Sequence, residues 1–273
     1  MRRLLIMMCL FVMALPVAAF AQSKTLMMAT TTSTADTGLL DYLAPLFQKD
    51  TGIELKWTAV GTGKALEMGK NCDVDVLLVH SPSAEAKFVE EGNGIERKQL
   101  MYNDFVLVGP VADPAKVGGK SVDEALKGIA ASKAPFLSRG DNSGTHNLEV
   151  KLWQKSGMAP EKEGWYVSTG QGMLRTIAMA AEKSGYTVTD RGTWIKYEDT
   201  LKGAKPELKI IVEGDKSLLN QYSGIVVNPA RCPKVQADLA RKFIDWMASP
   251  VGQKAIGSFL LSGKPLFTAN AGK

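Results

Sequence analysis

The sequence reads TTTST at residues 30–34, directly after the apolar run 25–29, and SRGDNSGT at residues 138–145, at the end of a second extended run. Each segment stands where a strand is expected to give way to a helix. Such junctions lie at the carboxyl edge of a parallel sheet, where the helix N-terminus presents unpaired N–H groups to ligands. Hydroxyls, backbone N–H groups and the Arg139 guanidinium are all hydrogen-bond donors. The two segments therefore predict two halves of an oxyanion site.

Around these segments, short apolar runs alternate with amphipathic segments, which is typical of an α/β protein with largely parallel sheets. A first set of strands is expected at 25–29, 53–60, 74–79 and 105–108, with helices at 39–51, 61–70 and from Pro82. In a second set, strands are expected at 135–138, 166–168, 186–188 and 210–212, with helices at 125–131, from Ser143 and at 174–181. The strand 225–227 and helices at 235–247 and from Pro250 are expected to return to the first set.

Prolines and glycines between residues 110 and 119 mark the first boundary between two lobes. We expect one lobe to comprise residues 22–108 plus 225–273 and the other to comprise residues 109–224. Two lobes of this size agree with the usual size of a domain.

The start of the chain is that of a secreted protein. Arg2 and Arg3 precede an uncharged run, and Ala19-Phe20-Ala21 supplies the small-residue cleavage signature. The alternative is an uncleaved membrane anchor, but the run is short for a span of about 20 residues. Residues 1–21 are therefore predicted to be a signal peptide, which places the mature protein in the periplasm.

Charge and cysteine content limit the partners. Loss of Arg2 and Arg3 with the signal peptide lowers the formal net charge from +5 to +3, and no run of five or more Lys or Arg occurs. Nucleic acid is therefore not expected as a partner, whereas a mild positive excess suits a diffusing anion.

Cys72 and Cys232 remain in the mature chain. Whether they pair stays open, because two thiols distant in sequence say nothing about proximity.

Two more junctions have a similar composition, Gly61-Thr62-Gly63 and His80 to Ser83. Taken alone, Thr62 or Ser81 is better explained as an ordinary helix cap or turn. The segment 30–34 is harder to explain in this way, since a cap needs one hydroxyl and five are present. Arg139 can aim a planar two-donor fork at the point that the next helix faces. The alternative is a surface arginine paired with Asp141.

Three segments together resemble the tungstate-binding proteins of TupA-type ABC transporters. They are ATTTST at 29–34, VGTG at 60–63 and SRGDNSGTH at 138–146. The resemblance covers essentially the whole mature chain, including YSGI at 222–225. The Arg-x-Asp-x-Ser-Gly-Thr pattern alone is less specific, because phosphate-binding proteins carry something similar.

The resemblance implies a two-lobed type II periplasmic binding protein fold. In this fold each lobe is a mostly parallel sheet flanked by helices, and the ligand lies in the cleft between the lobes. One lobe would contribute Thr30, Thr31, Thr32, Ser33, Gly61, Thr62 and Ser81 to the anion, and the other would contribute Arg139, Ser143, Gly144 and Thr145. A ligand that takes donors from both lobes favours their closed arrangement. The implied protein is a monomer that delivers tungstate, or molybdate, to a membrane permease subunit.

The presence or absence of a hydrogen-bond acceptor distinguishes the candidate anions. Hydrogen phosphate keeps a proton near neutral pH and is usually recognised through a carboxylate acceptor, whereas tungstate, molybdate and sulfate dianions need donors only. The first three junctions contain no Asp or Glu among their expected contacts, and Asp141 is better placed to hold Arg139 and cap the next helix. The residues therefore favour a fully ionised dianion. The choice of tungstate comes from the resemblance.

A secreted hydrolase is the main alternative from another class. It requires a nucleophile and a base, yet the only histidines are His80 and His146, and no Gly-x-Ser-x-Gly elbow is present. A zinc site is not expected either, since no Cys-x-x-Cys or nearby pair of histidines occurs. His146 is expected to orient its own loop. We expect a binding protein with no cofactor and no enzymatic activity.

Overall fold

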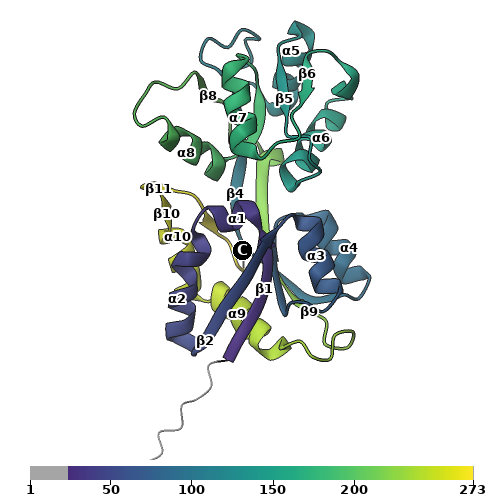
Figure 1. Cartoon of the computed structure of the whole chain (residues 1–273), viewed down its shortest axis with the longest axis vertical. Helices are drawn as coiled ribbons and strands as arrows, with labels where there is room; N and C mark the ends of the chain where they lie inside the picture. Colours follow the sequence, from purple (N-terminus) through teal and green to yellow (C-terminus); the bar gives the residue numbers. More distant parts are fainter. Residues whose placement is uncertain (1–23, 273) are drawn as a thin grey trace, which may run out of the picture.

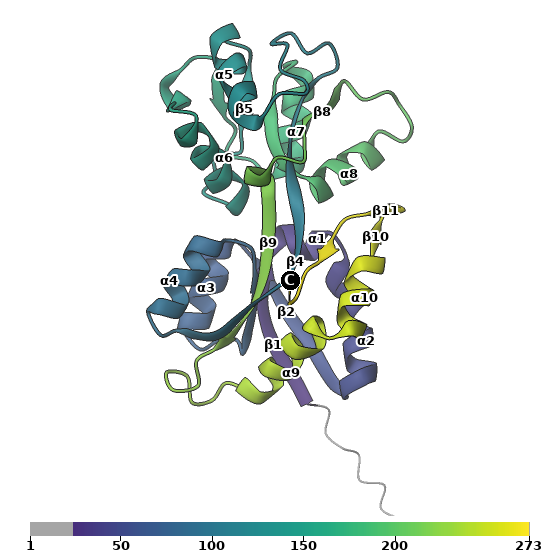
Figure 2. The same ribbon diagram turned by 180° about the vertical axis from the view of Figure 1, so that it is seen from behind.

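Two long strands, β4 (Gly94–Pro110) and β9 (Leu219–Val227), join two α/β lobes. The computed structural model describes residues 24–272 and shows the lobes one above the other, with β4 and β9 side by side between them (Figures 1 and 2). Residues 94–104 of β4 pair with β9, whereas residues 105–110 pair with the strands of the upper lobe. The α/β fold predicted from the sequence is confirmed.

The lower lobe is built on a sheet in the order β12-β4-β9-β3-β1-β2. Its strands outside the joining pair are β1 (Lys24–Thr31), β2 (Ile53–Val60), β3 (Val76–Val79) and β12 (Thr268–Ala269). β1 runs parallel to β2 and β3, as the sequence predicts. The joining strands run antiparallel to their neighbours. β1 and β2 end beneath the upper lobe (Figure 1), and β3, which runs parallel to β1, ends at the same edge of the sheet.

Helices cover both faces of the lower sheet. They are α1 (Thr32–Asp36), α2 (Leu39–Thr51), α3 (Thr62–Lys70), α4 (Pro82–Glu90), α9 (Ala237–Ala248) and α10 (Pro250–Ser258). The short hairpin β10 (Leu260–Leu261) and β11 (Lys264–Pro265) follows α10. Burial of the apolar stripes of α2 and α9 stabilises this lobe, because Leu40, Phe47 and Phe243 are inaccessible to solvent.

In the upper lobe, β4 pairs with β7 (Thr187–Asp190) and β8 (Leu208–Val212), and β5 (Phe136–Ser138) runs parallel to β6 (Tyr166–Ser168). The helices of this lobe are α5 (Val122–Ser132), α6 (Gly144–Lys155), α7 (Met173–Glu182) and α8 (Arg191–Thr200). Short 3₁₀ turns lie at Pro160–Lys162 and Lys216–Leu218. A capping box, in which Ser121 and Glu124 bond each other's backbone N–H, fixes the start of α5.

Several elements differ from the sequence prediction. Helix α8 and the short strands β10, β11 and β12 were not predicted, β4 begins well before residue 105, and β9 begins at Leu219 instead of Ile225. The polar stretch of β4 carries charges because much of it lies toward solvent, so its pattern is not that of a buried strand. Ile195 of α8 packs into the core of the lower lobe. This helix therefore also connects the two lobes.

The lobe boundaries at 108/109 and 224/225 stay a prediction. Phe105 and Leu107 pack in the apolar core of the upper lobe, together with residues of α5 and α6. Asp104 is the last residue of β4 that pairs with β9. We therefore propose that the chain passes from the lower to the upper lobe near Asp104.

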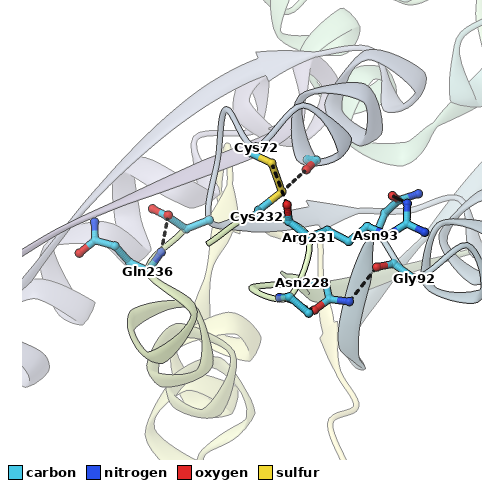
Figure 3. Close-up of a disulfide and its surroundings, with 10 residues drawn as sticks. Cys72, Gly92, Asn93, Asn228, Arg231, Cys232 and Gln236 are labelled. Carbon is cyan, nitrogen blue, oxygen red and sulfur yellow. Dashed lines mark hydrogen bonds between the residues drawn. A yellow bond between two sulfur atoms is a disulfide. The ribbon is translucent and has the colours of Figure 1, made fainter. Parts of the chain in front are cut away.

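Cys72 and Cys232 form a disulfide, which the sequence left open. It connects the end of α3 to the loop between β9 and α9, with a Cα–Cα distance of 5.4 Å (Figure 3). Around it, Arg231 donates to Asn93 Oδ1 and Asn228 donates to the Gly92 carbonyl. The disulfide thus anchors the segment that leads out of β9.

The predicted signal peptide, residues 1–21, lies outside the described residues. Within residues 24–272, none of the helices has the length and apolar character needed to cross a bilayer.

Candidate functional site

The segments 31–33 and 139–145 face each other across a cavity of about 320 Å³ between the lobes. The loop that begins α3 and the end of β3 complete its wall. The lining residues are Thr31, Thr32, Ser33, Val60, Gly61, Thr62, Gly63, Lys64, His80, Arg139, Asp141, Asn142, Ser143, Gly144 and Thr145. Donors from four chain segments therefore surround one space.

The first part of the lower wall is the turn from β1 into α1. Thr31 is the N-cap of α1, and its Oγ1 accepts from the Thr34 N–H at 3.2 Å. Thr32 and Ser33 follow in the first turn, where backbone N–H groups have no partner within the helix. Both line the cavity. This turn offers the anion hydroxyl and backbone donors together.

The second part of the lower wall is the N-terminus of α3. Gly61 is its N-cap and supplies no side-chain hydrogen bond, so the N–H groups of the first turn are not capped by a side chain. Thr62, Gly63 and Lys64 line the cavity. The positive end of the helix dipole and uncapped N–H groups both favour an anion at this point.

The upper wall is the loop between β5 and α6. The Arg139 side chain is 17% exposed and donates from Nε to Asp141 Oδ2 at 2.8 Å. The other oxygen of Asp141 accepts the Ser143 N–H, and Ser143 in turn caps α6 by accepting the His146 N–H. Asn142 donates its N–H to His146 Nδ1, so His146 orients this loop as predicted.

Gly140 allows the upper wall to take this shape, and Gly144 lies near the lower lobe. Gly140 has φ of +66°, and a Cβ there would collide with Ser168 Oγ. At Gly144, the first residue of α6, a Cβ would be in ordinary contact with Thr62 Oγ1 of the lower lobe, at 3.6 Å. Lys151, further along α6, donates to Ser83 Oγ at 3.2 Å. The helix N-terminus is therefore held against the opposite lobe.

Nine of the eleven residues that the sequence predicted for the site line this cavity, and two do not. Thr30 is fully buried and donates from Oγ1 to the Leu78 carbonyl, which joins β1 to β3. Ser81 begins α4, and its N–H donates to Glu85 Oε1 at 2.6 Å. The Thr30 side chain thus has a structural role, whereas the contact of Ser81 with Glu85 is made by its backbone.

His80 also lines the cavity, although the sequence prediction left it out of the site. Its position directly after a buried strand is the sequence feature from which its place in the site could have been predicted. Lys64 is a second addition, and it pairs with Glu67 at 3.1 Å. Within residues 24–272, no group of three or more His, Cys, Asp or Glu side chains is arranged to hold a metal cation.

A second cavity of about 540 Å³ shares Thr32, Ser33 and Arg139 with the first. Its other cations are Arg175 of α7 and Lys196 of α8, and its one acidic residue is Asp36. The neighbouring cavity thus has more cationic than acidic lining residues.

The charge states of the lining residues leave few acceptors. Burial alone would raise the pKa of Asp141, but hydrogen bonds from Ser143 and the charge of Arg139 bring that pKa below its ordinary value. The carboxylate therefore stays ionised, and both its oxygens are engaged. Burial lowers the pKa of His80, only partly offset by its bond to Asn220 and the charge of Asp190. The ring is therefore neutral at neutral pH.

Glu149 of α6 supports the upper wall from behind. Its oxygens accept from Ser138 Oγ at 2.5 Å and from the Tyr166 hydroxyl at 2.8 Å. Ser138 is the last residue of β5 and directly precedes Arg139. Burial raises the pKa of Glu149 to about 7, although both hydrogen bonds lower it.

This raised pKa predicts a loss of stability at alkaline pH. A carboxyl whose folded-state pKa is raised stabilises the fold at low pH, and this contribution disappears as pH rises through about 7. In the wild type, ionisation of Glu149 should lower the unfolding free energy by about 3 kcal/mol between pH 5 and pH 9. In Glu149→Gln this decrease should be absent. Urea denaturation at both pH values measures it, with the exposed Glu90→Gln as control. An unchanged pH dependence in Glu149→Gln would contradict the assignment.

Known proteins resemble the chain over nearly its whole length. A family model described as a PBP superfamily domain matches residues 18–251. The tungstate-binding protein TupA of Campylobacter jejuni is 50% identical over 239 residues, covering 88% of each chain. TupA of Peptoclostridium acidaminophilum is 50% identical over 253 residues, covering 91% of this chain and 86% of the relative.

Solved structures agree with the sequence relatives. The tungstate-binding protein TupA from Desulfovibrio alaskensis G20 has a TM-score of 0.87 and 68% identity, covering 91% of this chain and 99% of its own. The tungstate ABC transporter structure from Geobacter sulfurreducens has a TM-score of 0.75 and 48% identity, covering 86% and 98%. The resemblance inferred from three sequence segments is confirmed. The chain therefore belongs to the PBP superfamily and, within it, to the family of TupA tungstate-binding proteins.

Proposed function

We propose that this protein captures tungstate as a fully ionised tetrahedral dianion between its lobes and delivers it to the permease of an ABC transporter. The observation that carries the proposal is the convergence of donors from both lobes on one cavity whose single carboxylate, Asp141, is already engaged. The names of the relatives, which are tungstate-binding proteins, support the choice of ligand.

The donor set is sufficient for tight binding. Six charge-assisted hydrogen bonds of about 1.5 to 3 kcal/mol each amount to at least about 9 kcal/mol. Nanomolar affinity corresponds to about 12 kcal/mol, which lies within the range that such a set supplies. Because the donors come from both lobes, binding favours closure, and the closed form is the one that we propose the permease recognises.

We propose that the site binds and does not catalyse. Thr31 and His80 lie 2.9 Å apart, as a nucleophile and base would, but Thr31 is only 3% exposed and its oxygen accepts from Thr34. The far nitrogen of His80 meets the amide of Asn220 instead of a carboxylate. This pair is therefore a structural hydrogen bond, which argues against the hydrolase alternative.

The remaining expectations are part of the same proposal. The protein would be exported by its predicted signal peptide, cleaved after residue 21, and would act in the periplasm as a monomer. The disulfide between Cys72 and Cys232 supports an oxidising compartment.

Calorimetric titration with four anions at pH 8 tests the ligand. Tungstate is expected to bind most tightly, molybdate next, and sulfate more weakly because it is a smaller dianion. Phosphate is expected to bind at least about 100-fold more weakly than tungstate, because hydrogen phosphate finds no free acceptor in the cavity. Molybdate has the same charge and shape as tungstate, so it is the second candidate ligand. Tighter binding of phosphate than of tungstate would overturn the proposal.

A further inference from the structure

His80 lies between the anion cavity and the strands that join the lobes. It follows β3, is 9% exposed, and stacks on Tyr222 of β9 with ring centroids 4.6 Å apart. On the cavity side, its Nε2 is 2.9 Å from Thr31 Oγ1 and 3.3 Å from Ser33 Oγ. On the other side, its Nδ1 is 2.9 Å from Asn220 Oδ1. One ring therefore contacts both the site and β9.

The hydrogen bonds of Asn220 assign the proton of His80 to one ring nitrogen. The amide nitrogen of Asn220 donates to Asn103 Oδ1 at 2.7 Å and to the Tyr222 hydroxyl at 3.2 Å. With the Asn220 oxygen facing His80, Nδ1 is assigned as the donor to it. In the neutral ring the other nitrogen, Nε2, is then an acceptor.

This tautomer fixes the hydroxyls of the α1 turn. Thr31 donates its proton to Nε2, and its oxygen accepts the Thr34 N–H and the Thr34 hydroxyl, the latter at 2.6 Å. The Thr31 hydroxyl is then fully engaged with the protein. The acceptor on His80 is also occupied, so the hydroxyl proton of Ser33 is left for an anion in the cavity.

The charged groups near His80 come from several elements. Asp190 at the end of β7 acts on the ring through its charge. Lys64 of α3, and Arg139 with its partner Asp141, line the same cavity. Tyr222, which stacks on the ring, is uncharged at neutral pH because burial raises its pKa.

We propose that His80 is a positioning residue for anion capture. By accepting the Thr31 proton it aims the first turn of α1 at the cleft. Through Asn220 and Asn103 it ties that turn to β9 and β4, the two strands that join the lobes. The inference rests on the proposed function, because it concerns how that same site binds its dianion.

Two conservative variants separate the two sides of the ring. In His80→Asn the amide takes the place of Nδ1 and keeps a donor toward Asn220, but nothing reaches Thr31. In His80→Gln the amide oxygen takes the place of Nε2 and still accepts from Thr31. Tungstate affinity is expected to fall about 10-fold in His80→Asn and to stay within about threefold of wild type in His80→Gln. Urea denaturation measures the stability of both variants separately.

Equal affinity of the two variants, whether wild-type or equally reduced, would overturn the inference. A purely structural role would lower stability without separating the two dissociation constants. A wild-type protein that fails to bind tungstate would instead overturn the proposed function, so the two failures are distinguishable.

A spectroscopic test uses the wild-type chain and does not depend on how the variants fold. The sequence contains only two histidines, so ¹⁵N labelling of histidine gives two ring systems, and His146→Gln assigns them. At pH 7, His80 is expected to be neutral with its proton on Nδ1. A proton on Nε2, or a charged ring, would overturn the inference.

Discussion

Replacement of Arg139 by alanine is expected to weaken tungstate binding roughly 100- to 1,000-fold, about 3 to 4 kcal/mol, while the fold remains intact. Arg139 is the cation that the cavity shares with its larger neighbour, and only one of its nitrogens, Nε, is engaged by Asp141. The rest of the guanidinium is available for two parallel bonds to a tetrahedral anion. Its removal also leaves the charge of Asp141 facing the site without compensation.

Calorimetry with tungstate measures the effect, and circular dichroism checks the fold. Arg139→Lys keeps the charge but loses the two-donor fork, so an intermediate affinity is expected. Arg175→Ala is the matched control, because that side chain is 61% exposed and lines only the neighbouring cavity. Wild-type affinity in Arg139→Ala would show that the anion binds elsewhere.

The junctions between strands and helices were predictable from the sequence because each carries its own local signal. The run of hydroxyls at 30–34 and the segment 138–145 exceed what a helix cap needs, and both meet at one cavity. The pairing of Arg139 with Asp141 and the loop-holding role of His146 follow from their spacing. Local chemistry was sufficient for these features.

Features that depend on contacts across the fold were not predictable. Helix α8 packs through Ile195 into the other lobe, so its apolar residues do not follow the stripe of a helix on a single core. His80 belongs to the site only because Thr31 and Asn220, distant in sequence, lie on either side of it. The side chain of Thr30 bonds to β3. A row of identical threonines gives no indication of which one, Thr30 or Thr31, makes this contact.

Removal of the disulfide is expected to have the largest effect on the stability of the fold. Cys72 and Cys232 are separated by 160 residues, and the loop that they close contains the whole upper lobe and both joining strands. In the chain-entropy model, a cross-link over a loop of this length stabilises the fold by about 5 kcal/mol, and removal of native disulfides costs about 2 to 5 kcal/mol. Cys72→Ala/Cys232→Ala should therefore lower the unfolding free energy by about 3 to 5 kcal/mol.

Affinity should respond differently from stability. Neither cysteine lines the anion cavity, so the double variant is expected to bind tungstate within about threefold of wild type under conditions in which both are folded. Guanidinium denaturation with and without a reducing agent provides the comparison. Reduction should lower the wild-type midpoint to that of the double variant and leave the variant unchanged. If reductant shifted the midpoints of both proteins equally, the shift could not come from the disulfide, because the variant has none. This result would contradict the predicted stabilisation. The cross-link would then constrain the unfolded chain far less than its 160-residue span requires.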